Sequence, residues 1–315
     1  MSEYKKYSVV LLDYWQHTGN MADVTMSIND LDLPEKARKF IITEWGIETL
    51  HPPQAQSMGP IFSGRSSLIA IPTASGKSLI AYIAIIRKLL LEEIGSKAVY
   101  IVPLKALATE KYDELKSLGE ALNLTIGLGI GDATSETKKI NECDILVCTS
   151  EKLDSLMRNR SETMSNVSII VADEFHLLND ASRGPTLEIN LTKLRHLKPK
   201  AQIVALSATV GNCNELANWL DAELIISDWR PVALEYSTYH DLHLEPRLVQ
   251  SSARTSKPSN LKPPRDLTGP KSHPTWVALD DSIDNGGQLL IFVGTRKSAE
   301  SEAIKLAKRL SLIHI

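Results

Sequence analysis

The chain has few cysteines, and none of them is placed to hold a metal ion. Three cysteines occur among 315 residues, Cys143, Cys148 and Cys213, and none belongs to a C-x-x-C pair or lies near a histidine at zinc spacing. This spacing argues against a zinc finger and against a disulfide framework. We therefore expect reduced, buried thiols in a cytoplasmic protein.

Long apolar runs and a surplus of charge of one sign are also missing. Asp13, Arg87 and Lys88 interrupt the longest apolar segments, which stay well short of the ~20 residues that a membrane span needs. We therefore expect no membrane-spanning helix. The net charge of −3 argues against a globally basic nucleic-acid binder, so any polynucleotide contact must be a local patch.

What is present indicates a folded chain with a substantial core, because 43% of the residues are hydrophobic and 23% are charged. From about Leu33, strand-like and helix-like segments alternate, which predicts a parallel sheet with helices on both faces. The predicted strands are 66–72, 97–103, 124–130, 144–150, 167–173, 201–209 and 223–227. The predicted helices include 33–45, 77–94 and 106–122.

The pattern changes after about Ser227. Residues 250–272 are rich in Ser, Pro, Lys and Arg and read as a loop or insertion. A predicted strand at 287–295 and a helix at 296–310 then begin a new unit. One strand and one helix cannot bury a core, so we expect the chain to be truncated. The expected division is an N-terminal extension at 1–30, an α/β domain at 31–228, and a bridge, insertion and incomplete second domain at 229–315.

The segment Ile71–Ser78, IPTASGKS, joins a predicted strand to a predicted helix, as a phosphate-binding loop does. Gly76 would allow close approach of the backbone, Lys77 would reach the outer phosphates, and the Ser78 hydroxyl would ligate Mg²⁺. Ile71 stands where the general pattern has glycine, so an exposed turn carrying a lysine is the alternative. The candidate nucleotide-binding residues of the loop are Pro72, Thr73, Ala74, Ser75, Gly76, Lys77 and Ser78.

Two adjacent carboxylates follow the apolar run of VSIIVADEFH. Asp173 and Glu174 would stand at the carboxyl end of a buried parallel strand, where open α/β sheets bind ligands. Asp173 would hold Mg²⁺ and Glu174 would deprotonate the attacking water, the two tasks that phosphoryl transfer needs beside Lys77. Without the phosphate loop, the same residues would read as a helix cap or a solvated turn.

With these residues in place, the chain resembles superfamily 2 helicases, and most closely the archaeal HELQ-like DNA repair helicases of the Ski-two-like group. The resemblance runs from about Leu31 to Ser301. LHPPQAQ resembles the family's Q motif, which implies that the amide of Gln54 recognises adenine. The family's own phosphate loop also has a non-glycine first residue, which answers the objection that Ile71 raises.

Two further segments resemble the family's polynucleotide-binding motifs, PLKALATEK at 103–111 and TSEKLDSLMR at 149–158. The implied contact residues are Pro103, Leu104, Lys105, Thr149 and Ser150. Without the resemblance, Lys105 and Lys111 would read as solvated surface charge. Phosphate contacts of this kind give affinity without sequence readout.

SAT at 207–209 resembles motif III, which links hydrolysis to movement along the polynucleotide. The implied coupling residues are His176, Ser207, Ala208 and Thr209. His176 would bridge to Gln202 or to SAT, with a satisfied buried histidine as the alternative. For Trp219 and Trp229 we expect packing rather than base stacking.

The resemblance also implies two RecA-like domains. WRPVALE resembles the bridge between them, and LIFVGTRKSAE resembles motif IV of the second. The family's Q-x-x-G-R-x-G-R segment, which supplies arginine fingers worth roughly 10³ to 10⁵ in rate in other systems, does not occur in the chain. We therefore expect the isolated chain to bind nucleotide weakly and to hydrolyse it very slowly.

The expected function is that of an ATP-dependent DNA helicase that uses Mg²⁺. By resemblance alone, it would move 3′ to 5′ on single-stranded DNA and act on forked or branched repair intermediates. An RNA helicase or RNA-remodelling ATPase of the same superfamily is one alternative, since both share the motor. A non-catalytic module that binds nucleotide and a single polynucleotide strand is another.

Overall fold

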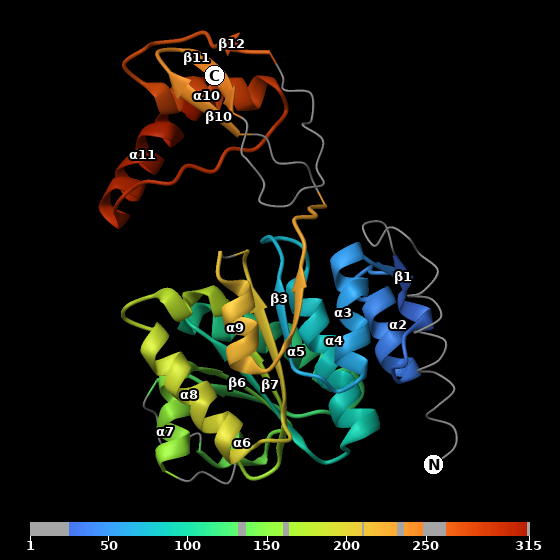
Figure 1. Cartoon of the computed structure of the whole chain (residues 1–315). Helices are drawn as coiled ribbons and strands as arrows, with labels where there is room; N and C mark the ends of the chain where they lie inside the picture. The colour runs from blue at the N-terminus through green and yellow to red at the C-terminus, as the bar shows by residue number, and fades with distance from the viewer. Residues whose placement is uncertain are drawn as a thin grey trace. The chain divides into compact units, whose positions relative to one another are not determined.

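A computed structural model describes residues 25–131, 137–159, 164–209, 211–231, 236–247 and 263–313. The chain divides into two compact units, Met1–Pro231 and Val232–Ile315 (Figure 1). Most of the predicted N-terminal extension, residues 1–24, lies outside the described residues, and so does the part of the predicted insertion at 250–262.

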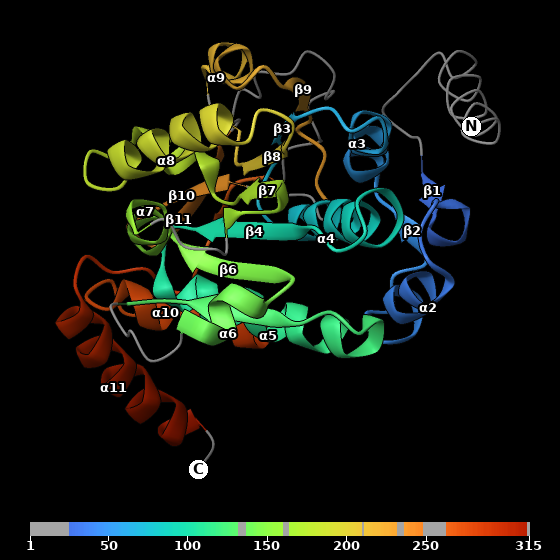
Figure 2. The same cartoon turned by 90° about the horizontal axis from the view of Figure 1, so that it is seen from below.

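The first unit is built on a seven-stranded sheet in the order β5-β6-β4-β7-β8-β3-β9, with every neighbouring pair parallel (Figure 2). Its strands are β3 Ser67–Ala70, β4 Lys97–Val102, β5 Ile126–Gly129, β6 Ile145–Thr149, β7 Val167–Ala172, β8 Gln202–Ser207 and β9 Glu223–Ile226. Each of the seven lies within a segment predicted as a strand. The predicted α/β fold with a parallel sheet is thus confirmed.

Helices cover both faces of this sheet. The connections from β3 to β5 run towards one edge and those from β5 to β9 run back, so right-handed crossovers place the two sets of helices on opposite faces. The first layer has α2 Glu35–Thr43, α3 Pro52–Phe62, α4 Lys77–Arg87 and α5 Lys105–Leu122. The second has α6 Thr137–Glu142, α7 Ser150–Arg158, α8 Gly184–Leu197 and α9 Cys213–Leu220.

Short elements complete the unit. A two-stranded antiparallel pair precedes the sheet, and α4 continues into a π-helical turn rather than running as one α-helix to residue 94. These elements are β1 Met26–Ser27, η2 Ile28–Asp30, β2 Thr49–Leu50, η3 Lys88–Glu92 and η6 Phe175–Asn179. The predicted helices 33–45 and 106–122 correspond to α2 and α5.

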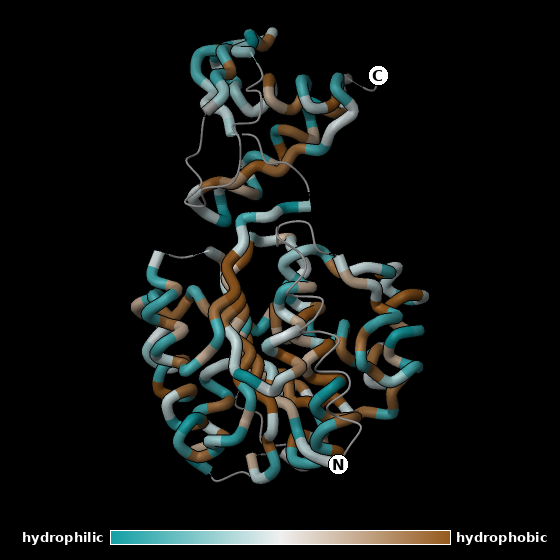
Figure 3. Tube along the Cα trace, turned by 45° about the vertical axis from the view of Figure 1, so that its right-hand side comes forward, coloured by the Kyte–Doolittle hydropathy of each residue, from teal (hydrophilic) through white to brown (hydrophobic). Residues whose placement is uncertain are grey.

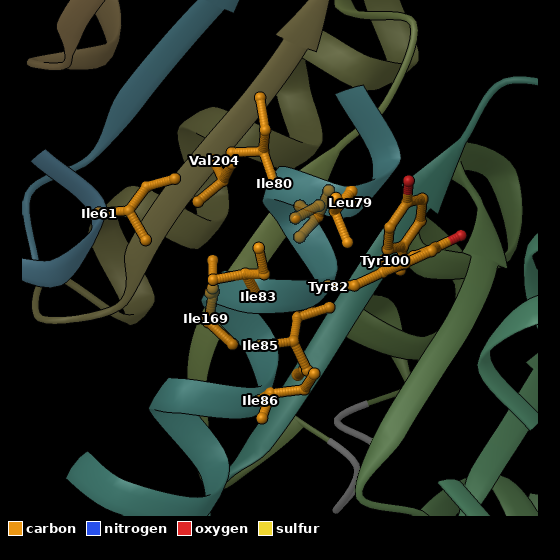
Figure 4. Close-up of a cluster of buried hydrophobic side chains, with 14 of the residues drawn as sticks. Ile61, Leu79, Ile80, Tyr82, Ile83, Ile85, Ile86, Tyr100, Ile169 and Val204 are labelled. Carbon is orange, nitrogen blue, oxygen red and sulfur yellow. The ribbon is translucent and has the colours of Figure 1, made fainter. Parts of the chain in front are cut away.

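Alternate residues of the central strands pack into different layers. In β4, Val99 and Ile101 join the cluster under α7 and α8, while Tyr100 and Val102 join the one under α4 and α5. Figure 3 shows hydrophobic residues along the strands, and Figure 4 shows the aliphatic side chains that α4 contributes. Burial on both faces explains why these strands read as continuous apolar runs.

The second unit has a different architecture. Its three strands form an antiparallel sheet in the order β10-β11-β12. Its elements are β10 Tyr236–His240, β11 His243–Arg247, β12 Arg265–Asp266, α10 Pro274–Asp284 and α11 Arg296–Ile313. The predicted helix at 296–310 is confirmed within α11. That this unit begins a second RecA-like domain stays a prediction.

The strand predicted at 287–295 is wrong. The structure gives this segment no ladder partner, and Leu290 and Phe292 are 78% and 87% exposed. A strand forms only where a neighbouring backbone takes its hydrogen bonds. This segment has the apolar pattern of a central strand, but within the described part of the unit it does not join the three-stranded sheet.

Candidate nucleotide and polynucleotide site

The loops that carry the sequence motifs lie at one edge of the sheet. The strands are parallel, so their carboxyl ends meet at the same edge, and β3, β4, β6, β7 and β8 each lead into a motif. Ligands of open α/β sheets bind at this edge. The fold therefore gathers the predicted residues into two adjoining regions, one after β3, β7 and β8 and one after β4 and β6.

The phosphate loop has the left-handed backbone that a glycine permits. Gly76 has φ of 71° and forms the N-cap of α4, and Ala74 also has positive φ, at 63°. A Cβ atom on Gly76 would lie 2.3 Å from Nε2 of Gln54. Glycine is needed at residue 76 both for its backbone and for the approach of Gln54. Thr73 and Ala74 are exposed beside it, whereas Pro72 is buried.

Lys77 is held inside the loop, with only 8% of its surface exposed. Its Nζ donates hydrogen bonds to the carbonyl oxygens of Ile71 at 3.1 Å and Pro72 at 3.2 Å. Burial lowers the pKa of Lys77, while the nearby charges of Glu174 and Asp173 act in the opposite direction. The ammonium group is therefore positioned by carbonyl groups that an incoming phosphate could replace.

Gln54 links the Q-motif helix α3 to the phosphate loop. Its Nε2 donates to the carbonyl of Gly76 at 3.0 Å, and its Oε1 accepts from the backbone N–H of His51 at 2.7 Å. An amide has a second N–H and a second lone pair on its oxygen, and adenine recognition would have to use these. The side chain is buried, so its orientation is fixed by the protein.

The same loop is joined to the end of the first unit, a link that the sequence did not indicate. The hydroxyl of Ser75 donates to the carbonyl oxygen of Trp229 at 3.3 Å. The Trp229 ring packs on His51, with centroids 4.5 Å apart. Packing was predicted for both tryptophans and is confirmed, because Trp219 lies against Phe175. No spacing rule connects His51 to Trp229, so only the fold reveals the contact.

The two carboxylates after β7 are held in different ways. Asp173 is buried, and its oxygens accept from Tyr100 at 2.7 Å and from the backbone N–H of Glu174 at 2.8 Å. Glu174 has φ of 49°, a conformation that few non-glycine residues adopt and that gathers at functional sites. Its Oε2 lies 3.2 Å from Nδ1 of His176.

His176 stands between the carboxylates and the SAT segment. The backbone N–H of Ala208 lies 3.5 Å from its Nδ1, the same atom that faces Glu174. Gln202 takes no part, because it is at the amino end of β8 and donates to the carbonyls of Ile61 and Arg65. Contact with Gln202 and contact with SAT were the two alternatives predicted for His176, and the structure contains the contact with SAT.

The other SAT residues continue from β8 into the site. Ser207 is buried; its carbonyl accepts from the backbone N–H of Ile71, and its hydroxyl donates to the carbonyl of Ala208. SAT is thus tied by the backbone to the start of the phosphate loop. Thr209 is exposed.

The region after β4 is open. Leu104 and Lys105 are exposed and Pro103 is half-buried. Lys111, which without the resemblance would read as solvated surface charge, is buried, and its Nζ lies 3.0 Å from Glu114, three residues along the same face of α5. That alternative reading is therefore wrong for Lys111.

Thr149 and Ser150 are only 3% and 5% exposed. Thr149 is the N-cap of α7, its hydroxyl accepting from the backbone N–H of Lys152. The carbonyl of Ser150 accepts from Asn190 at 2.7 Å. The structure thus places both residues at the predicted edge, with the Thr149 side chain and the Ser150 backbone carbonyl engaged in structural hydrogen bonds.

The described ranges contain no group of three or more His, Cys, Asp or Glu placed to hold a metal ion, and no helix long and apolar enough to cross a membrane. Cys143, Cys148 and Cys213 are buried and outside any disulfide, as predicted. Burial raises the pKa of Cys143 to about 11, which makes it a poor nucleophile.

Comparison with known proteins agrees with this geometry. Residues 51–216 match the family model described as DEAD/DEAH box helicase. Proteins named ATP-dependent DNA helicase Hel308 are 43% identical over 288 residues in Thermococcus kodakarensis and 42% over 291 in Methanocella arvoryzae, covering 91% of this chain in each case. The chain spans 23% and 37% of the lengths of these two relatives. The predicted resemblance is confirmed, and the chain belongs to the DEAD/DEAH box helicase family.

Proposed function

We propose that this chain is the nucleotide-binding part of an ATP-dependent DNA helicase that moves 3′ to 5′ on single-stranded DNA. One observation carries the proposal: Lys77, the carboxylates Asp173 and Glu174, and the SAT segment meet at one edge of the sheet, beside the exposed loop at Lys105. A motor needs hydrolysis and polynucleotide contact to share one rigid frame.

In the proposed site, the phosphate loop binds the nucleotide. The N–H groups at the start of α4 face the phosphates, and Lys77 exchanges its two carbonyl partners for phosphate oxygens. Gln54 on α3 and the remaining residues of the phosphate loop would complete the nucleotide-binding site. The loop's fixed left-handed residues favour this role, since they keep N–H groups oriented before the ligand arrives.

Ser78 and Asp173 would hold Mg²⁺ together with the phosphates. One hydroxyl and one carboxylate match the few protein ligands that Mg²⁺ usually takes at nucleotide sites. When bound, the ion would neutralise charge on the phosphates. The absence of a larger acidic cluster among the described residues fits a metal brought in with the nucleotide.

Glu174 is the proposed general base. Its carboxylate is half-buried, and His176 faces one of its oxygens at 3.2 Å. When Glu174 accepts a proton from the attacking water, the charge of the carboxylate that faces His176 would change. His176 also meets the Ala208 N–H, so this contact would transmit the state of the nucleotide to SAT.

Polynucleotide binding is assigned to the loop Pro103–Lys105 and to the start of α7. Exposed Lys105 would contact phosphates, giving affinity that depends on salt and not on sequence. Thr149, whose side chain caps α7, and Ser150, which is buried, would contribute through the backbone N–H groups at the α7 N-terminus.

DNA rather than RNA is proposed because the matching relatives are named DNA helicases. Action on forked repair intermediates and a cytoplasmic location belong to the same proposal. So does the division into a first RecA-like domain at 31–228 and part of a second at 229–315. The alternative functions are an RNA-remodelling ATPase and a non-catalytic module that binds nucleotide and a polynucleotide strand.

ATP turnover by the full-length protein tests the proposal. It would be measured without polynucleotide, with single-stranded DNA and with single-stranded RNA, and Lys77→Ala would serve as control. Stimulation by DNA supports the DNA helicase. Stimulation mainly by RNA would move the assignment to RNA remodelling, and no stimulated turnover would leave the binding module.

A further inference from the structure

A tyrosine on a central strand of the sheet extends its hydroxyl group to the proposed nucleotide site. Tyr100 lies on β4, is completely buried, and belongs to the cluster between the sheet and α4. Its hydroxyl donates to Oδ2 of Asp173 at 2.7 Å. Figure 4 shows its ring beside Tyr82 at the border of the aliphatic cluster, with both hydroxyls directed away from the isoleucines.

Packing alone does not explain why the side chain of residue 100 carries a hydroxyl group. The neighbours of Tyr100 on the same face of β4 are Ala98 and Val102, and a phenylalanine ring would fill the same space. A buried hydroxyl costs free energy unless it is hydrogen-bonded, and its bond to a carboxylate is of the stronger, charge-assisted kind. The position therefore favours a polar role at Asp173.

The bond fixes the orientation of the Asp173 carboxylate. One oxygen accepts from Tyr100 and the other from the backbone N–H of Glu174, so rotation of the group would break both hydrogen bonds.

Tyr82 lies beside Tyr100, with ring centroids 6.1 Å apart, but its hydroxyl donates to Glu114 on α5. The hydrogen bond from a phenol to Asp173 therefore comes from Tyr100.

We propose that Tyr100 is a positioning residue for the metal–nucleotide complex, which fixes the Asp173 carboxylate in the orientation that would ligate Mg²⁺. The inference rests on the proposed function, because that function assigns the metal to Asp173. Tyr100 touches neither substrate nor metal; it acts through Asp173. Its loss would weaken nucleotide binding only where Mg²⁺ contributes to that binding.

The test is the Mg²⁺ dependence of nucleotide binding by Tyr100→Phe, with a fluorescent ADP as the probe. With Mg²⁺ we expect about tenfold weaker binding, which corresponds to one lost hydrogen bond to a charged group. In EDTA the affinity should stay within about twofold of that of the unmodified chain, because Lys77 and the loop are intact.

Ser168→Ala is the matched control. It removes another buried hydroxyl, which is hydrogen-bonded to Ser96 at 2.6 Å. Ser168 lies near the amino end of β7, the strand that leads to Asp173. This variant should keep the Mg²⁺ dependence of the unmodified chain. An equal loss of Mg²⁺-dependent affinity in both variants would show a general effect of weakened packing and overturn the proposal.

A double-mutant cycle with Asp173→Asn separates positioning from a structural role. If Tyr100 acts through Asp173, the double variant should bind the Mg²⁺ complex about as weakly as Asp173→Asn alone. Additive losses, or a folded Tyr100→Phe with unchanged Mg²⁺ dependence, would refute the inference. If the unmodified chain bound the probe equally well with and without Mg²⁺, the metal assignment itself would fail, a result distinct from failure of Tyr100 alone.

Discussion

The two regions at the carboxyl edge of the sheet differ in how their side chains are held. After β3, β7 and β8, functional groups are buried and already have partners: Lys77 with two carbonyls, Gln54 with Gly76, and Asp173 with Tyr100. After β4, by contrast, Lys105 is exposed.

This difference matches what each region would bind. A nucleotide must be held at fixed geometry for phosphoryl transfer, and oriented groups in a buried site favour that. A polymer that slides past must be held weakly at many points, for which exposed charge and backbone groups are sufficient. Buried, hydrogen-bonded side chains, which make a site rigid, are thus concentrated where the chemistry would occur.

The largest effect is expected from Glu174→Gln, which tests whether the rigid region performs the chemistry. The amide cannot accept a proton, so turnover by the full-length protein should fall by about 10²- to 10⁴-fold. Nucleotide affinity should change little, because the phosphate loop is untouched. Steady-state hydrolysis and equilibrium binding measure the two quantities, and a variant with retained turnover would disprove the role of Glu174 as general base.

A smaller effect is expected from Gly76→Ala, which tests the fit between the phosphate loop and Gln54. The added Cβ would meet Nε2 of Gln54 at 2.3 Å, on a backbone of φ 71°. We expect at least about tenfold weaker nucleotide binding, because the Cβ would displace the Gln54 amide and break its hydrogen bond to the carbonyl of residue 76.

Gly64→Ala is the matched control for that change. Gly64 has almost the same φ, 73°, but a Cβ there would have no atom within 4 Å. It should lower the free energy of unfolding by about 1–2 kcal/mol through backbone strain alone and leave nucleotide affinity unchanged. Thermal unfolding and fluorescent ADP binding give both values. Equal loss of affinity in the two variants would assign the effect to strain and not to Gln54.

The sequence predicted the rigid region better than the open one, for a physical reason. Buried parallel strands leave continuous apolar runs, and a phosphate loop needs glycine, lysine and serine at fixed spacing, so β3, β7 and Lys77 could be read directly. Polar contacts between distant segments leave no such pattern. Tyr100 beside Asp173, and Trp229 beside His51, emerged only from the fold.

Exposure at the open region was also hard to read from the sequence. Lys111 and Thr149 belong to residue types that are usually solvated, but a local ion pair and a helix cap bury them here. The apolar segment 287–295 shows the converse error, because pairing depends on a neighbouring strand that no local pattern reveals. Periodicity reports the faces of an element but not its partners.

A several-fold effect is expected from Lys105→Ala, which tests whether the open region binds the polynucleotide. Losing one phosphate contact should weaken binding of single-stranded DNA and reduce the slope of log affinity against log salt by about 0.7. Lys116→Ala, an exposed lysine on the same helix more than ten residues further along, is the control and should leave the slope unchanged. Identical slopes for both variants and the unmodified chain would remove Lys105 from the contact surface.

The smallest effect on DNA binding is expected from Thr149→Ala, although Thr149 was among the predicted contact residues. Its hydroxyl caps α7 and is almost buried, so the variant should lose about 1 kcal/mol of unfolding free energy, as N-cap substitutions typically do. Affinity for single-stranded DNA should change by less than about twofold, because the backbone N–H groups of α7 remain. Denaturant unfolding and DNA titration measure the two effects. A large loss of affinity with little loss of stability would mean that the hydroxyl leaves its cap to meet the polynucleotide, and the contrast between a rigid and an open region would then not hold at α7.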